Sequence, residues 1–481
     1  MKKLVVVAGL AGWLISGDWL IGLCSFVLAL GWVVLQADEG PPVMALAFTL
    51  QWITVCIGLY YVDLTGRPLQ ATLASDYRTM MLIGLGCLVA LLAGLWAGQW
   101  LISRLKPLEG VRPLYALTFK SLVLCYVVGT FFTGAVQTLA WSFPTITQAI
   151  IAITFLRLGL LYLVLRRLVA ADRWLVMAGV LVFEVGLGVT GFHAGFREPL
   201  IMAVLAFLER FDRRNVRHWA SLGVIFVAMG FLGVAWMSVR VDYRERYLAD
   251  EAFSQNRGAR LDNLTAATRH WATQDQGELY SNIDSFIDRL WAIYYPALAV
   301  SRVPDVIPHT DGQLMLNTLQ FVFEPRIFFP DKPEVGSDSD LVRKYSGVYV
   351  AGEESSTDIA FGYAAESYID FGVPLMFIPV FIWGTFMGAC YGCIFKYYRH
   401  RDIAVSIATV ICWLSLYLFE RSWAKTIGLG GTLMIYVGGL SFLLDRLWYE
   451  KFRTVYVDQL TDAEEPIAAA PPPFQFQPHS K

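Results

Sequence analysis

TLQFVFEPRIFFPDKPEVGSDSDLVRKYSGVYVAGEESSTDIAFGYAAESYIDFG, residues 318–372, is the one long stretch in which this apolar chain turns polar and charged. About nine apolar segments precede it and three follow it. Because 56% of the 481 residues are hydrophobic and only 16% are charged, such segments indicate membrane-spanning helices. The sequence therefore predicts an all-α integral membrane protein in which this stretch forms most of an extramembrane site.

Charge is divided unevenly along the chain. Residues 241–370 carry 11 Arg or Lys against 21 Asp or Glu, a net charge of about -10, so the remainder is basic. This division is a topology signal and argues against a nucleic acid ligand. We expect 241–370 to be a large extracytoplasmic loop.

Apolar runs set the expected spans, because crossing a bilayer takes about 20 mostly apolar residues. Treating the start of the chain as two spans places the basic loops on the cytoplasmic side, as the positive-inside rule asks. Both termini are then cytoplasmic. The twelve expected spans are approximately 4–16, 19–36, 43–62, 79–102, 114–140, 146–165, 174–193, 197–211, 219–240, 371–395, 403–419 and 426–445.

Four regions follow from these spans. An N-terminal transmembrane bundle of about nine spans covers 1–240, and the extracytoplasmic loop covers 241–370. Transmembrane helices occupy 371–445, and 446–481 is a cytoplasmic, partly disordered tail with a Pro- and Ala-rich composition. Within the loop, apolar residues from Ile283 to Tyr294 recur at helical spacing, which predicts an amphipathic helix on the membrane surface or on the bundle.

Signals for metal, nucleotide and redox chemistry are weak. Cys390 and Cys393 form a CxxC inside an apolar run, which favours membrane-helix packing, and none of the seven cysteines lies in the polar stretch. Asp338 and Asp340 resemble a metal-binding DxD, but three such letters occur often by chance in an acidic loop. No phosphate-binding glycine loop or metal-ligand spacing is present. We expect no metal and no cofactor.

Charged residues at the outer ends of spans are stronger candidates, since burying a charge near lipid is costly. Arg197 and Glu198 begin the span at 197–211, where helix amides also favour an anion. The alternative is a plain Arg197–Glu198 surface pair. Arg421, with Glu420 and Lys425, lies at the outer end of the eleventh span, where the alternative is an interfacial charge cluster.

The polar stretch itself adds cations and carboxylates. Arg326 and Lys332 stand six residues apart around IFFP, with prolines that restrict the backbone. Glu354, Asp358 and Glu366 follow. Such cations could clamp a pyrophosphate and such carboxylates could accept a proton. A solvated mixed-charge loop explains each residue singly, but the whole set less well.

Three segments now carry a resemblance: GFREPLIMAVLAFLERFDRR (195–214), FEPRIFFPDKP (323–333) and AESYIDFGVPLMFIPVFIWGTFMGA (365–389). In order and spacing they resemble the Wzy-type oligosaccharide repeat-unit polymerases of bacterial surface polysaccharides. The resemblance covers about 191–392. The Gly-Phe before Arg197 and the Phe before Pro330 depart from the family's usual residues, which affects fine specificity more than reaction class.

The resemblance implies a glycosyltransferase that polymerises polyprenyl-pyrophosphate-linked oligosaccharides at the outer face of the bacterial inner membrane. Its implied partners are these lipid-linked oligosaccharides, membrane lipid, a flippase and a chain-length regulator. Pyrophosphate is a good leaving group that arginine can stabilise without a metal. The expected pyrophosphate-binding residues are Arg197, Arg326, Lys332 and Arg421, and the expected bases are Glu366, Asp358 and Glu354, with His309 behind them.

Two alternatives stay open at this point. An O-antigen-ligase-like transferase would move finished polymer to another acceptor. A lipid-linked oligosaccharide flippase or transporter would be a different class, with charges strung through the bundle and a small outer loop. The spans are largely free of charge apart from Lys120, Arg157 and Glu184, which the sequence does not explain.

Overall fold

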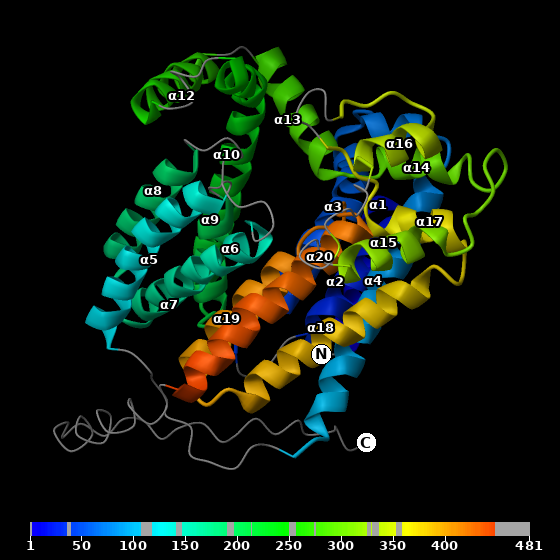
Figure 1. The fold of residues 1–481 in the computed structure, drawn as a ribbon. Coiled ribbons are helices and arrows are strands. Elements are labelled where there is room, and N and C mark those ends of the chain that lie inside the picture. The colour runs from blue at the N-terminus through cyan, green and yellow to red at the C-terminus, as the bar shows by residue number, and fades with distance from the viewer. Residues whose placement is uncertain are drawn as a thin grey trace.

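The computed structural model shows a bundle of helices, and every regular element in the described part of the chain is a helix (Figure 1). The described residues are 2–35, 40–106, 118–140, 147–189, 197–212, 214–249, 256–273, 276–324, 329, 336–352 and 358–447. The expectation of an all-helical fold is confirmed for this part of the chain.

The helices follow the apolar runs of the sequence. In chain order they are α1 (Lys2–Ser16), α2 (Trp19–Leu35), α3 (Val43–Thr65), η1 (Gln70–Leu73), α4 (Tyr77–Ser103), α5 (Phe119–Ala140), α6 (Thr147–Thr154), α7 (Leu156–Ala170), α8 (Trp174–Val189), α9 (Arg197–Leu208), α10 (Val216–Ala249), α12 (Arg257–Ala272), α13 (Gln276–Leu290), α14 (Tyr294–Val300), α15 (Gln313–Phe323), α16 (Asp338–Ser346), α17 (Tyr363–Phe371), α18 (Phe377–Tyr397), α19 (Arg401–Leu416), α20 (Trp423–Thr432) and η3 (Leu433–Gly439).

Seven helices of the described residues are long and apolar enough to cross a membrane. The α6–α7 pair and the α20–η3 pair each count as one of them. A helix also occupies the position of each other expected span, but α1, α2 and α8 are shorter apolar helices. The seven are Val43–Thr65, Tyr77–Ser103, Phe119–Val136, Thr147–Ala170, Val216–Met237, Phe377–Tyr397 and Trp423–Leu447.

The tenth expected span begins later than its apolar run suggests. The run continues from α17 into α18 without a polar break, yet the helix stops at Phe371 and restarts at Phe377. Gly372 ends α17 with a positive φ of 62°, a conformation that glycine adopts without a Cβ penalty. Its position against the His309 ring leaves no room for a side chain, because a Cβ there would lie 2.8 Å from Nε2.

Among the described helices, α4 and α18 make the most extensive contact with each other (Figure 1). Four glycines, Gly94 and Gly98 on α4 with Gly384 and Gly388 on α18, face the opposite backbone at this crossing. A Cβ at Gly384 would lie 2.6 Å from the Leu91 carbonyl oxygen, and the other three positions are as tight or tighter. Such small-residue pairs let membrane helices approach closely and gain van der Waals contact.

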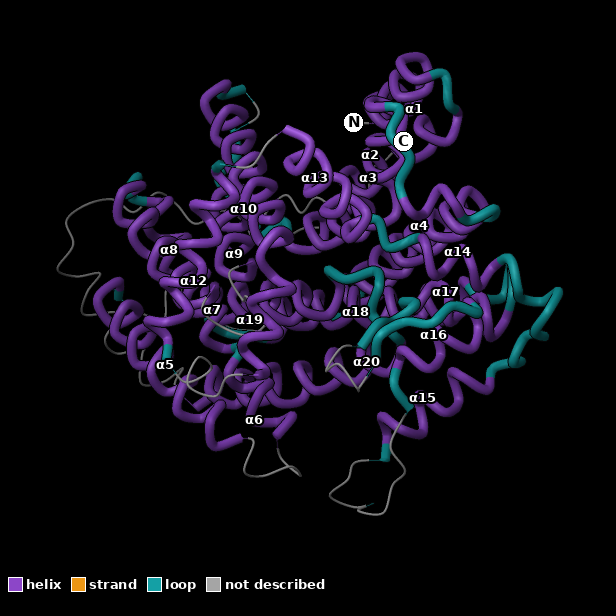
Figure 2. The backbone as a smooth tube through the Cα atoms, turned by 90° about the horizontal axis from the view of Figure 1, so that it is seen from above, coloured by secondary structure: helices purple, strands orange, loops and turns teal. Residues whose placement is uncertain are grey.

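Helix α19 lies at the centre of the bundle and packs against α3, α7 and α18 (Figure 2). All of its residues from Ala404 to Leu416 are buried. It therefore connects the N-terminal helices α1–α4 with the group α5–α9. Tyr417 follows directly after its last residue, Leu416.

The amphipathic helix expected within 241–370 is present as α13, and it packs against α3 and α10. Trp291, just after α13, fills the notch at Gly58 and donates from Nε1 to the Val55 carbonyl over 2.8 Å. The polar side is also held, because Asp284 accepts from Tyr61 over 2.6 Å and pairs with Arg67 over 2.6 Å. Both sides of α13 are thus fixed to α3 and to Arg67, which follows α3.

Enlarging a crossing glycine tests the importance of the α4–α18 contact. We expect Gly388→Leu to lower the thermal midpoint of purified protein by several degrees, since overpacking costs about 1–3 kcal/mol or more. Gly179→Ala in α8 is the matched control, because a Cβ there meets no atom within 4 Å. A midpoint unchanged by Gly388→Leu would contradict the role of this crossing.

Candidate anion-binding site

Two short buried helices, α9 and α19, are tied together at one end by ion pairs with α7. Arg166 pairs with Glu209 over 2.6 Å and with Asp402 over 3.2 Å, and Arg167 pairs with Asp402 over 2.9 Å. This network fixes the level at which α9 ends and α19 begins. At the opposite ends of the two helices stand Arg197 and Tyr417.

Arg197 and Arg421 converge on one tyrosine. The Nη2 atom of Arg197 donates to the Tyr417 hydroxyl over 2.8 Å, with its guanidinium carbon 4.8 Å from the ring centroid. The guanidinium carbon of Arg421 lies 5.4 Å from the same centroid. Cation–π attraction holds guanidinium groups over such faces. The structure thus brings together two cations that are more than two hundred residues apart in the chain, and we call them the arginine pair.

The arginine pair is incompletely neutralised. Arg197 pairs with Glu198 over 3.0 Å, and its side chain is 46% exposed. Arg421 donates from Nη1 to the Leu414 carbonyl over 2.6 Å and forms no ion pair with a described residue. Burial, and then the nearby charge of Arg197, lower the pKa of Arg421 despite the opposing effect of Tyr417. An anion beside Tyr417 would relieve this repulsion.

The second neighbouring carboxylate, Glu420, is held mainly by Arg289, although its charge also acts on both members of the arginine pair. Glu420 accepts two bonds from the guanidinium of Arg289, over 2.8 and 3.2 Å. Its backbone precedes Arg421, so the Arg289 pair ties α13 to the turn that carries the arginine. Bidentate pairing of this kind gives geometric specificity as well as energy. We refer to residues 417–423 as the arginine turn.

Glu366 lies beneath the arginine turn, on α17. Its side chain is buried, with 6% exposed, and Oε2 accepts from the Trp423 backbone amide over 2.8 Å. Burial raises its pKa to about 8; the Trp423 amide opposes this effect, and the charges of Asp338 and Asp370 add to it. The carboxyl therefore has little contact with solvent and is engaged by a backbone amide.

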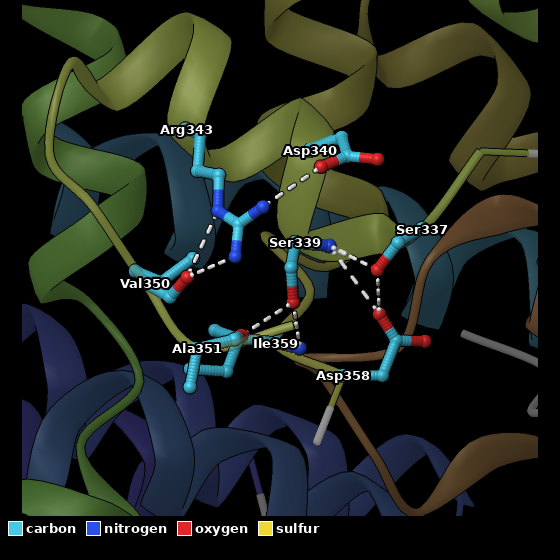
Figure 3. Close-up of polar contacts among 8 residues, drawn as sticks. All are labelled: Ser337, Ser339, Asp340, Arg343, Val350, Ala351, Asp358 and Ile359. Carbon is cyan, nitrogen blue, oxygen red and sulfur yellow. Dashed lines mark hydrogen bonds and ion pairs between the residues drawn. The ribbon is translucent and has the colours of Figure 1, made fainter. Parts of the chain in front are cut away.

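Asp358 lies in a second cluster, with Lys425 and Asp338. Lys425 contacts the Asp358 carboxylate and pairs with Asp338 over 2.8 Å. Asp358 also accepts from the Ser337 hydroxyl over 2.9 Å, as Figure 3 shows. Burial alone would raise the pKa of Asp358, but Lys425 and these donors hold it below its usual value. That lowered pKa makes Asp358 a weak proton acceptor.

The DxD carboxylates point to different cations. Asp338 faces Lys425, whereas Asp340 pairs with Arg343 over 3.2 Å. Arg343 also donates to the Val350 carbonyl from Nε and Nη2, over 2.9 and 2.7 Å (Figure 3). These contacts hold the residues from Ser337 to Val350 together around α16. In the described residues no group of three or more His, Cys, Asp or Glu side chains could hold a metal ion.

His309 packs against the end of α17. Its Nδ1 atom lies 3.2 Å from the Ile369 carbonyl oxygen, and its ring meets Tyr368 edge-on at 5.6 Å. The adjacent Asp370 accepts from the amides of Gly312, Leu314 and Met315 at the start of α15. His309 therefore belongs to the joint between α15 and α17, apart from the arginine pair.

Three expected site residues, Arg326, Lys332 and Glu354, lie outside the described residues. Of the remaining five, the structure brings Arg197 and Arg421 together and places Glu366 against the arginine turn, where it accepts from the Trp423 amide. Tyr417 was not expected. A tyrosine at the end of an apolar run is typical of a membrane interface. Only its contacts with Arg197 and Arg421 in the structure identify Tyr417 as part of the candidate site.

The charges in the bundle that the sequence left unexplained have separate explanations. Glu184 on α8 is 1% exposed and contacts both Arg157 on α7 and the Tyr126 hydroxyl on α5. Lys120 is exposed at the start of α5. Arg157 and Glu184 thus satisfy each other, as buried charges in membranes usually must.

Comparison with known proteins gives a family. Residues 88–391 match a family model described as a domain of unknown function, DUF8712. The match spans more than half of the chain, so the protein belongs to this family. The matched region contains Arg197, Asp358 and Glu366 and ends before Tyr417 and Arg421. The comparisons with curated proteins and with solved structures gave no match.

The raised pKa of Glu366 predicts a pH dependence of stability. The unfolded carboxyl ionises near pH 4.5, whereas the folded one keeps its proton to about pH 8. Its contribution is complete below pH 4.5, falls as pH rises by about 1.4 kcal/mol per unit, and is lost above pH 8. Thermal unfolding from pH 5 to 8 should show a steeper decline for wild type than for Glu366→Gln. Parallel curves would contradict the assigned pKa.

Proposed function

We propose that this protein is a glycosyltransferase that polymerises polyprenyl-pyrophosphate-linked oligosaccharide repeat units into a surface polysaccharide. The observation that carries the proposal is the arginine pair, two incompletely neutralised guanidinium groups gathered on Tyr417 in an apolar helical bundle. The resemblance of 191–392 to Wzy-type polymerases supplies the reaction class. The family match itself assigns no activity.

The depth of the arginine pair suits a lipid-linked substrate. Helix α9, with 12 residues, is about 18 Å long, and α19, with 16 residues, is about 24 Å long. Both are shorter than the roughly 30 Å of a hydrocarbon core. If the network of Arg166, Glu209 and Asp402 marks the inner boundary, the arginine pair lies below the outer boundary, within reach of a headgroup held by its lipid tail.

The proposed setting follows the expected topology. Twelve spans place both termini in the cytoplasm and 241–370 in the periplasm of a bacterium, with the protein in the inner membrane. The seven helices of membrane-crossing length support a membrane location. Membrane lipid and the lipid-linked oligosaccharides are then direct partners, and a flippase and a chain-length regulator are functional ones.

The arginine pair would act on the leaving group. As the glycosidic bond to pyrophosphate breaks, negative charge grows on the departing phosphate oxygens. The planar donors of Arg197 and Arg421 can stabilise that charge without moving. The Tyr417 hydroxyl, which accepts from Arg197, still has its proton to donate to a phosphate oxygen. Arg326 and Lys332 are proposed to complete the cation set.

The acceptor hydroxyl needs a base, and the expected candidates differ in their contacts. Glu366 is buried, Asp358 has a lowered pKa, and His309 lies against α17. Glu354 stays a proposed base. Glu198 is the carboxylate paired with Arg197, with 21% of its side chain exposed, and is a further candidate.

Lipid-linked oligosaccharide transport is a second candidate, favoured by the Arg157–Glu184 pair inside the bundle. Ionisable residues within membrane segments often mark transport pathways. Transport would move the lipid-linked unit across a vesicle membrane without lengthening it. A ligase would instead transfer polymer to a different acceptor, so the product separates all three activities.

Purified protein in liposomes, given lipid-linked repeat units, tests the proposal by the length of the product on a gel. Wild type should yield a ladder, and Arg197→Ala and Arg421→Ala should each slow elongation about 10²–10³-fold, because each removes one transition-state donor. Arg78→Ala is the matched control, since Arg78 is an exposed arginine that pairs with Asp18, which lies between α1 and α2. Normal ladders from both site variants would rule out this assignment.

A further inference from the structure

Helix α17 holds the arginine turn through backbone and side-chain bonds. The Tyr363 amide donates to the Arg421 carbonyl over 2.8 Å, and the Trp423 amide donates to Glu366 over 2.8 Å. The indole Nε1 of Trp423 donates to the Ser367 hydroxyl, also over 2.8 Å. Three residues of α17 therefore bind the Arg421 carbonyl and Trp423, two residues further along the chain.

The start of α17 is also pressed against the turn. Gly362 has a φ of 88°, and a Cβ there would lie 2.5 Å from the Phe419 carbonyl oxygen and 2.9 Å from the Glu420 Cα. The ring of Tyr363 packs against Phe419 and Trp423 at 5.3 and 5.4 Å. The turn thus has little freedom to move away from α17.

Glu366 is the polar group at the centre of this contact. Its carboxyl meets the first residue of α20, where a helix leaves backbone amides without intrahelical partners. The charged groups that act on it are Asp338, Lys425 and Asp370. The opposite charges of Asp338 and Lys425 partly cancel. The hydrogen bond that links Glu366 to the arginine turn comes from the Trp423 amide.

We propose that Glu366 is a positioning residue, whose carboxyl fixes the Trp423 amide so that Arg421 presents its guanidinium group beside Tyr417. Its effect on elongation rests on the proposed function, whereas its effect on the turn does not. The role requires one hydrogen-bond acceptor and no negative charge. A neutral carboxyl serves, which agrees with burial of the group.

Two substitutions separate positioning from proton transfer. Glu366→Gln keeps a carbonyl oxygen for the Trp423 amide but cannot accept a proton, whereas Glu366→Ala removes the acceptor. A positioning residue predicts that the glutamine variant retains elongation within about threefold of wild type. A general base predicts that both variants lose elongation alike.

Two further readouts follow the turn itself. Hydrogen exchange of 417–426 should rise at least tenfold in Glu366→Ala and stay near wild type in Glu366→Gln. Binding of polyprenyl pyrophosphate in nanodiscs should weaken at least tenfold in the alanine variant alone. Asp370→Ala is the matched control, because Asp370 is a buried carboxylate that binds the start of α15. Its effect on exchange should fall on 312–316.

The outcomes are distinguishable. If wild type binds polyprenyl pyrophosphate but does not elongate the lipid-linked repeat unit, the proposed function is wrong. Hydrogen exchange of 417–426 and lipid binding by the Glu366 variants then still test the positioning role of Glu366. Should Glu366→Gln lose elongation as fully as Glu366→Ala with exchange unchanged, Glu366 is the base and the positioning role is wrong. Unchanged exchange at 417–426 and unchanged binding in Glu366→Ala would also overturn it.

Discussion

Backbone-to-backbone contact between α4 and α18 is the constraint on which the rest of the structure depends. Gly94, Gly98, Gly384 and Gly388 allow this contact because none of them carries a Cβ. In lipid there is little hydrophobic force between helices, so close packing must supply the attraction. Helix α18 follows α17 after a short turn, and α4 also contacts α17. The crossing therefore fixes the helix that binds the arginine turn.

Short helices then define where charge can sit. Helices α9 and α19, with 12 and 16 residues, are shorter than a helix that spans a hydrocarbon core, and Arg197 and Tyr417 stand at their ends. Their other ends are fixed by ion pairs with α7. Two arginines held near one another store electrostatic repulsion, which an anionic ligand relieves. The repulsion between the two arginines, which is unfavourable in the free protein, thus favours binding of the proposed anionic ligand.

Sequence reasoning located the helices well, because apolar runs report burial in lipid or protein directly. It also selected Arg197 and Arg421 from their positions at helix ends, since a charge there needs a partner. It did not distinguish the anion-binding role proposed for these arginines from the positioning role proposed for Glu366. That distinction depends on α17 packing against residues more than fifty positions later, and nothing in the local sequence encodes such a contact. Tyr417 was missed for the same reason.

A double-mutant cycle on the arginine pair tests the central claim most directly. Binding of polyprenyl pyrophosphate would be measured for wild type, Arg197→Ala, Arg421→Ala and the double variant in nanodiscs. If both residues hold one anion, the double variant should lose less than the sum of the single losses, with a coupling of about 1 kcal/mol or more. Losses that add to within about 0.3 kcal/mol, or no loss at all, would contradict a shared site.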